Sequence, residues 1–172
     1  MLPAPFGGPL RTAKVVLLYL SPGLTAQDRA EADIAEVQQY FMGQRTGHAP
    51  FRTEGGGFKW LTDRTKCFGD WALISPHLAK LNIGGYHSKT FEDAPLLAAL
   101  PSSRISIGWA QDVLFPQAER GQRVVICLRS ARFWGLEQGE RYGHSSSLLP
   151  GGHADMASDS TVLEVTRDEE RV

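Results

Sequence analysis

The amino-acid sequence predicts an α/β protein, a three-layer α/β/α sandwich whose central sheet is mostly parallel and has four strands. Three observations predict it: continuous apolar runs typical of buried strands, helical periodicity between them, and glycine- and proline-rich turns at their ends. Alternating strands and helices require right-handed crossovers, which place helices on both faces of the sheet. The length of 172 residues indicates a single domain over residues 1–172.

The first strand is expected at residues 14–20, a continuous β-branched and apolar run followed directly by a Ser-Pro-Gly turn. A helix is expected next, because Thr25 and Asp28 approximate a capping box and apolar residues then recur at helical spacing through position 41. Residues 47–58 indicate a long loop, since their three consecutive glycines are unfavourable in a helix or strand. A further helix is expected at residues 59–68.

The second strand is expected at residues 78–86, with two glycines at its carboxyl end, and the third at residues 123–128. Residues 161–165 are either a short strand or a helix. A short helix is expected at residues 91–100, and Ser102 or Ser103 is expected to cap the next one. The side chains of that helix expected to face the core are Ile105, Trp109, Val113 and Leu114.

The composition excludes several classes of protein. Lysine and arginine number 18 against 19 acidic residues, a formal net charge of −1, and 42% of residues are hydrophobic. This balance argues against disorder throughout and against a strongly basic nucleic-acid-binding protein, while it allows a local basic patch. No apolar run approaches the roughly 20 residues of a membrane span, and two cysteines are too few for a disulfide scaffold. The N-terminal segment lacks targeting features, so we expect a cytoplasmic protein with no membrane partner.

Ligands of open α/β sheets bind outside the carboxyl ends of the strands, which directs attention to the loops there. Ser21, Pro22 and Gly23 follow the first strand, and backbone N–H groups before a helix attract anions or hold a water. The alternative is that Pro22 and Gly23 only make the turn from strand to helix. Neither a P-loop pattern nor a nucleophile elbow is present.

Asn82 is the most informative polar residue, because asparagine is disfavoured inside an apolar strand. A buried carboxamide offers donors and an acceptor and suits the edge of a base or amide; the alternative is an asparagine bonded to neighbouring backbone. Tyr86 and His87 follow as groups that stack and hydrogen-bond. Ser88 and Lys89 are candidates to hold a phosphate.

A metal site is not expected from the sequence. The five histidines and two cysteines show neither the helical i, i+4 spacing nor the C-x-x-C pattern of a zinc site. His153, in a turn-rich stretch, is either merely exposed or a charge stabiliser or general acid. Cys127 lies in a strand and is expected to be inert core.

The order of these motifs resembles the uracil-DNA glycosylase superfamily, in particular its bacterial uracil-DNA-glycosylase-like members, over roughly residues 5–153. The motifs are a Pro-Phe-Gly lead-in, a strand ending in a Pro-Gly turn, a strand followed by Tyr-His-Ser-Lys, and a later Arg-Ser-Ala-Arg-Phe-Trp segment. The resemblance implies a uracil-DNA-glycosylase-like fold and hydrolysis of the N-glycosidic bond of a damaged or deaminated base in DNA. It implies no metal and no organic cofactor.

The resemblance also implies roles for individual residues. Ser21 stands where the superfamily has Asp or Asn and would hold the attacking water with the turn that follows, and His153 would stabilise the departing base. Asn82 would read the Watson–Crick edge of the base. The other base-contacting residues would be Gly23, Tyr86 and His87, the phosphate-contacting residues Ser88, Lys89 and Arg129, and the candidates for stacking Tyr40, Phe41, Phe51 and Phe58.

Three functions therefore stay open. The first is an N-glycosylase acting on a base in DNA or on a free nucleoside. The second is a catalytically inactive module of the same fold that binds a nucleotide or nucleic acid. The third is an unrelated α/β hydrolase-like or transferase domain. The first two require Ser21 and Asn82 to line one cleft sized for a planar heterocycle.

Overall fold

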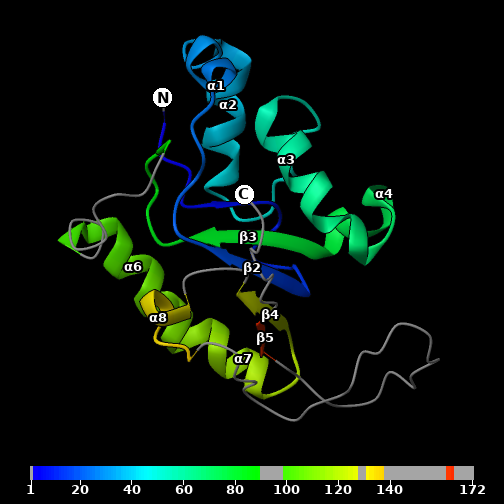
Figure 1. Ribbon diagram of the computed structural model, residues 1–172, viewed down its shortest axis with the longest axis vertical. Helices are drawn as coiled ribbons and strands as arrows, with labels where there is room; N and C mark the ends of the chain where they lie inside the picture. Colours follow the sequence, from blue (N-terminus) through cyan, green and yellow to red (C-terminus); the bar gives the residue numbers. More distant parts are fainter. Residues whose placement is uncertain (1, 90–98, 128–130, 138–161, 165–172) are drawn as a thin grey trace, which may run out of the picture.

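The computed structural model describes residues 2–89, 99–127 and 131–137 and the backbone of residues 162–164. A mixed five-stranded sheet lies in the middle, with α-helices on both sides (Figure 1). The strands are ordered β1-β3-β2-β4-β5. Their bounds are Phe6–Gly7 for β1, Val15–Tyr19 for β2, Leu78–Asn82 for β3, Val124–Cys127 for β4 and Val162–Glu164 for β5. The predicted α/β class is confirmed, and the sheet is mixed, with one antiparallel pairing beside three parallel ones.

The sheet contains one strand more than the four expected. Strands β3, β2, β4 and β5 are parallel neighbours, while β1 pairs antiparallel with β3, Phe6 lying opposite Leu81. A two-residue strand between prolines and glycines has no alternating pattern, so the sequence gives no signal for it. Strand β1 is held in the sheet by its neighbour β3, because the backbone N–H of Asn82 donates to the carbonyl oxygen of Pro5 at 2.7 Å.

Strand β2 is the central element of the core. It pairs with β3 on one side and β4 on the other, so that Leu17 lies opposite both Lys80 and Ile126. Val16, Leu17 and Leu18 are fully buried. A continuous apolar run is therefore buried on both faces, which is the reason that this strand was predictable from sequence.

Two hydrophobic clusters cover the two faces of the sheet. Val16, Leu18 and Leu81 face one side, where they pack with Leu114 and Trp134. That side is covered by α6 (Pro101–Trp109), a turn of π-helix η3 (Ala110–Leu114), α7 (Phe115–Glu119) and α8 (Ala131–Trp134) (Figure 1).

The opposite face of the sheet carries the smaller cluster. Leu17 and Tyr19 of β2 pack there with Phe51, Leu61 and Ile126. This side is covered by α1 (Ala26–Ala30), α2 (Ala35–Gln44), α3 (Gly56–Thr65) and α4 (Trp71–Ile74) (Figure 1). Short 3-10 turns, η1 (Lys66–Phe68) and η2 (Ser75–His77), connect α3 to α4 and α4 to β3.

Several element boundaries differ from the sequence prediction. The capping box of Thr25 and Asp28 is present, but one expected helix is two, because α1 ends at Ala30 and α2 begins at Ala35. Helix α3 begins inside the expected loop, where Gly55 has φ 91° and allows the chain to turn into the helix. Strand β3 ends at Asn82 rather than at residue 86, since the two glycines that follow favour a turn.

The next helix, α6, begins with Pro101 at its first position, not after a serine cap. Proline is favoured there because the first N–H of a helix has no partner within the helix. Ile105 is 72% exposed, so its expected core position is wrong, whereas Leu114 is buried. Most of the short helix expected at residues 91–100 falls outside the described residues, because residues 90–98 are not described. Within the part of the chain described, no helix combines the length and apolarity needed to cross a membrane.

We expect Leu18→Ala to lower the free energy of unfolding by about 2–5 kcal/mol, because Leu18 is 0% exposed and the variant leaves a cavity beside the sheet. Ile105→Ala is the matched control, with an expected change within about 0.5 kcal/mol at an exposed helical position. Urea unfolding followed by circular dichroism measures both. Equal losses in the two variants would contradict this account of the core.

Candidate functional site

A cavity of about 430 Å³ lies on the face of the sheet covered by α1, α2 and α3. Its walls come from the turn after β2, the carboxyl-terminal half of β3, and the segment from residue 51 into α3. The size is that of a small-molecule site. Its position outside the carboxyl ends of two parallel strands is the one expected for ligands of an open α/β sheet.

Ser21 and Asn82, the two residues that the sequence analysis singled out, both line the cavity. Tyr19 and Asn82 lie opposite each other in the parallel pairing of β2 and β3. The chain leaves β2 through Ser21, Pro22 and Gly23, all of which line the cavity together with Asn82. The expectation that Ser21 and Asn82 share a cleft therefore agrees with the structure.

The segment after β3 returns to the turn after β2. The backbone N–H of Ser88 donates to the carbonyl oxygen of Pro22 at 3.0 Å, and Gly23 forms a parallel bridge with Ser88. The Nδ1 atom of His87 lies 2.8 Å from the carbonyl oxygen of Gly23. These contacts place His87, Ser88 and Lys89 on the cavity wall beside the turn.

His87 has a defined protonation pattern. A carbonyl oxygen only accepts, so Nδ1 carries the proton and donates it to Gly23. Burial lowers the pKa of His87, and the positive charge of Lys80 adds to this, whereas the Gly23 hydrogen bond and Asp28 oppose it. The neutral ring then presents Nε2 as an acceptor, and this buried atom has no hydrogen-bond partner among the described residues.

Asn82 is 1% exposed and is held by the N-terminal segment. Its side-chain Nδ2 donates to the carbonyl oxygen of Ala4 at 2.9 Å. This contact is the backbone-bonded alternative considered for an asparagine in a strand. One hydrogen bond uses only part of a carboxamide, which offers a second N–H and an acceptor oxygen. The contact therefore fixes the orientation of the group and leaves it further hydrogen-bonding capacity.

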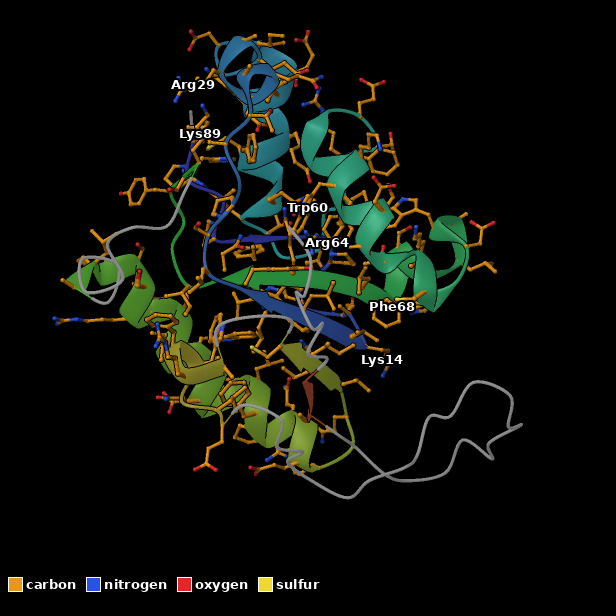
Figure 2. All side chains as sticks on the ribbon, in the orientation of Figure 1. Lys14, Arg29, Trp60, Arg64, Phe68 and Lys89 are labelled. Atoms are coloured by element: carbon orange, nitrogen blue, oxygen red, sulfur yellow. The ribbon has the colours of Figure 1, made fainter. Side chains whose placement is uncertain are left out.

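Aromatic side chains form much of the wall. All four residues proposed for stacking, Tyr40, Phe41, Phe51 and Phe58, line the cavity. Trp60 of α3, which the sequence analysis did not consider, also lines it and packs edge-to-face on Tyr19, with ring centroids 5.2 Å apart. Figure 2 shows Trp60 and Arg64 between α3 and the sheet, with the guanidinium 5.0 Å from the Trp60 ring. Such a wall suits a flat ring.

Four charged residues that line the cavity were missed as site residues: Asp28, Arg52, Glu54 and Lys80. Asp28 was considered only as a helix cap, and Lys80 was not considered, yet both line the cavity. The signal for Lys80 was available, because Lys80 and Asn82 are alternate residues of a strand and therefore share a face. Burial lowers the pKa of Lys80, and the carboxylate of Asp28 opposes this shift. Burial also raises the pKa of the Tyr19 phenol, against the opposing charge of Arg64.

Other proposed residues are not brought to the cavity. Tyr86 is 59% exposed and lines a separate surface depression with Leu2 and Arg29. Arg29 lies on the same side of the molecule as Lys89 (Figure 2). Arg129 and His153 fall outside the described residues. Cys127 is buried and Cys67 is exposed, and neither is in a disulfide.

Within the described ranges, no group of three or more histidine, cysteine, aspartate or glutamate residues is arranged to hold a metal ion. The chain matches no protein-family model, no curated protein and no solved structure. The interpretation of the cavity therefore rests on its own residues.

The lowered pKa of Lys80 predicts a pH-dependent stability. The unfolded chain binds this proton more tightly than the folded one, so the Lys80 contribution to stability rises with pH from the lowered pKa toward 10.5. We expect Lys80→Met to be more stable than the wild type near neutral pH, with a difference that shrinks as the pH rises toward 10.5.

Lys59→Met is the matched control, because the pH dependence of its effect on stability is expected to have the opposite sign. The hydrogen bond to Asp63 raises the pKa of Lys59, so Lys59 stabilises the fold below its ordinary pKa and this contribution is lost as the pH rises through the raised value. Urea unfolding at a series of pH values measures both differences. A Lys80→Met difference that does not change with pH would contradict the burial of this charge.

Proposed function

We propose that the cavity binds a nucleobase and that the chain hydrolyses the N-glycosidic bond of a damaged or deaminated base in DNA, as its resemblance to the uracil-DNA glycosylase superfamily implies. The observation that carries the proposal is the meeting of Ser21 and Asn82 in one cavity. The aromatic wall and the cavity volume of about 430 Å³ support it, because a flat heterocycle fits such a space.

In the proposed arrangement, different residues of the cavity contact the phosphates and the base of one nucleotide. Ser88 and Lys89, next to the turn after β2, would contact the phosphates of an extruded nucleotide, whose extrusion costs about a few kcal/mol. Asn82 would hydrogen-bond the edge of the base, and an aromatic ring would stack on its face.

In the proposed reaction, a water held by Ser21 and the backbone of the following turn attacks the anomeric carbon of the sugar. The bond from that carbon to the base nitrogen breaks, and the base leaves with its bonding electrons. The proton lost by the water ends on the released base, so the products are the sugar hydroxyl and the neutral base. Ser21 is uncharged, so the negative charge that would balance the developing positive sugar must come from elsewhere. Asp28 is a carboxylate on the same cavity and would supply it.

A second candidate function is binding without catalysis. It is favoured by Asn82, whose amide is already engaged by the carbonyl oxygen of Ala4, and by the absence of an acidic group at position 21. In this form the same cavity would hold a nucleotide, or a base within a nucleic acid, and no bond would break.

Incubation of the protein with a uracil-containing single-stranded oligonucleotide tests the first candidate. The expected result is release of free uracil and an alkali-labile site, and Asn82→Ala should lower the rate about a hundredfold or more by removing the base contact. Gln117→Ala, in α7 on the other side of the sheet, is the control and should keep the rate. No release from a panel of deaminated and alkylated bases would exclude catalysis on DNA bases.

The salt dependence of DNA binding tests the second candidate, and with it the contact proposed for Lys89. If Lys89 contacts a phosphate, Lys89→Ala should reduce the slope of log affinity against log salt by about 1. Arg120→Ala, at the carboxyl end of α7, should leave the slope unchanged. Fluorescence anisotropy with a labelled oligonucleotide measures both. Identical slopes in all three proteins would remove Lys89 from the interface.

A further inference from the structure

Lys80 occupies the floor of the cavity next to the proposed base-reading residue. It is the residue two before Asn82 in β3, and alternate residues of a strand point to the same face. Both side chains line the cavity. Because Asn82 is the last residue of the strand, Lys80 lies farther from the turns that follow the strands. A ligand that meets Asn82 therefore has Lys80 beside it, one strand repeat away.

The fold leaves room for the aliphatic part of this lysine. Gly7 of β1 is paired with Lys80 across the antiparallel ladder. A Cβ atom at Gly7 would lie 3.0 Å from Cε of Lys80 and 3.3 Å from a ring carbon of Phe51. The absence of a side chain at Gly7 therefore lets the lysine stem and the Phe51 ring pack over the edge strand together.

The ammonium group of Lys80 is not neutralised by a direct contact. Among the described residues, its Nζ makes no hydrogen bond and has no carboxylate within 4.0 Å. Asp28 acts on it only through its field, and one carboxylate oxygen of Asp28 already accepts two hydrogen bonds from Thr25, both at 2.7 Å. Lys80 is partly buried, and a cation that lines a cavity without a contacting counter-ion is available to an anionic group of a ligand.

Two further polar atoms of the cavity residues have no partner in the described part of the chain. They are the buried Oη of Tyr19, which is a donor, and the buried Nε2 of His87. Tyr19 itself is 9% exposed. Buried polar atoms are nearly always hydrogen-bonded, so these two atoms of cavity-lining residues keep unused hydrogen-bonding capacity. The ammonium group of Lys80 supplies donors, which match oxygen acceptors on a ligand.

We propose that the cavity takes a planar aromatic ligand bearing an anionic oxygen group, and that Lys80 binds this group beside Asn82. The proposal deepens the proposed base-binding function and rests on it for the contact of the ring with Asn82. It adds the requirement that the ligand carries an anionic oxygen group. The anionic oxygen belongs either to a carboxylate on the ring or to a phosphate, and binding measurements distinguish these two sources.

Isothermal titration calorimetry with uracil, orotate (uracil carrying a ring carboxylate) and uridine monophosphate tests the proposal. The wild type should bind one of the two anions about tenfold or more tightly than uracil, the factor typical of a hydrogen bond to a charged group. Preference for orotate identifies a carboxylate, and preference for uridine monophosphate identifies a phosphate. Lys80→Met should abolish the preference and leave the affinity for uracil within about twofold.

Two controls make the outcome specific. Lys59→Met removes an exposed cation of α3 that does not line the cavity and should retain the preference for the same anion. Lys80→Met should not lower the melting temperature, because it removes a partly buried charge and keeps a similar length, so loss of binding in it would not reflect unfolding. A preference for the anions that survives Lys80→Met, or equal affinity of the wild type for uracil and both anions, would overturn the proposal.

Benzoate and benzamide separate this proposal from the proposed function. They share a flat ring and lack the ring N–H and ring carbonyl groups of uracil. Lys80-dependent binding of benzoate over benzamide, with no binding of uracil, would support the anion site and contradict base recognition. Binding of uracil without any effect of Lys80→Met on either carboxylate would support base recognition and contradict the anion site. Failure of all five compounds to bind would contradict both.

Discussion

The parallel pairing of β2 with β3 is the constraint on which the candidate site depends. It places Tyr19 opposite Asn82, so both strands end at the same level. The pairing continues beyond them, because the N–H groups of Ile83 and Gly84 donate to the carbonyl oxygens of Tyr19 at 3.0 Å and Leu20 at 2.7 Å. A register shift of one residue would turn Lys80 and Asn82 away from the cavity. The geometry of the cavity is thus set by backbone hydrogen bonds.

The two faces of strand β3 have different roles: one packs into the hydrophobic core and the other lines the cavity. Ala79 and Leu81 are buried in the larger hydrophobic cluster, while Lys80 and Asn82 point to the opposite face and line the cavity. Placing an amine and a carboxamide there is unfavourable for folding unless they are hydrogen-bonded. The apolar face of β3 and the fully buried residues of β2 offset this cost. A site with incompletely paired polar groups is thereby tolerated in a stable fold.

The N-terminal segment contributes to the site although it contains no chemical group proposed to react. Its backbone carbonyls at Ala4 and Pro5 accept hydrogen bonds from the side chain and the backbone of Asn82. Gly7 gives the Lys80 stem its space. A short edge strand thus orients one polar group of the cavity and accommodates another. Its contacts join residues more than 70 positions apart, as in the pair 4 and 82, and have no local signature in the sequence.

The sequence by itself determined the elements whose signal is local: the buried strands, the capping box of Thr25 and Asp28, and the turn after β2. Apolar runs and caps act within a few residues, so they are readable without the fold. Only the tertiary structure decided that β1 joins the sheet, that Ile105 faces solvent and that Trp60 lines the cavity. Those outcomes depend on which distant surfaces meet, and packing between distant segments overrides local propensity.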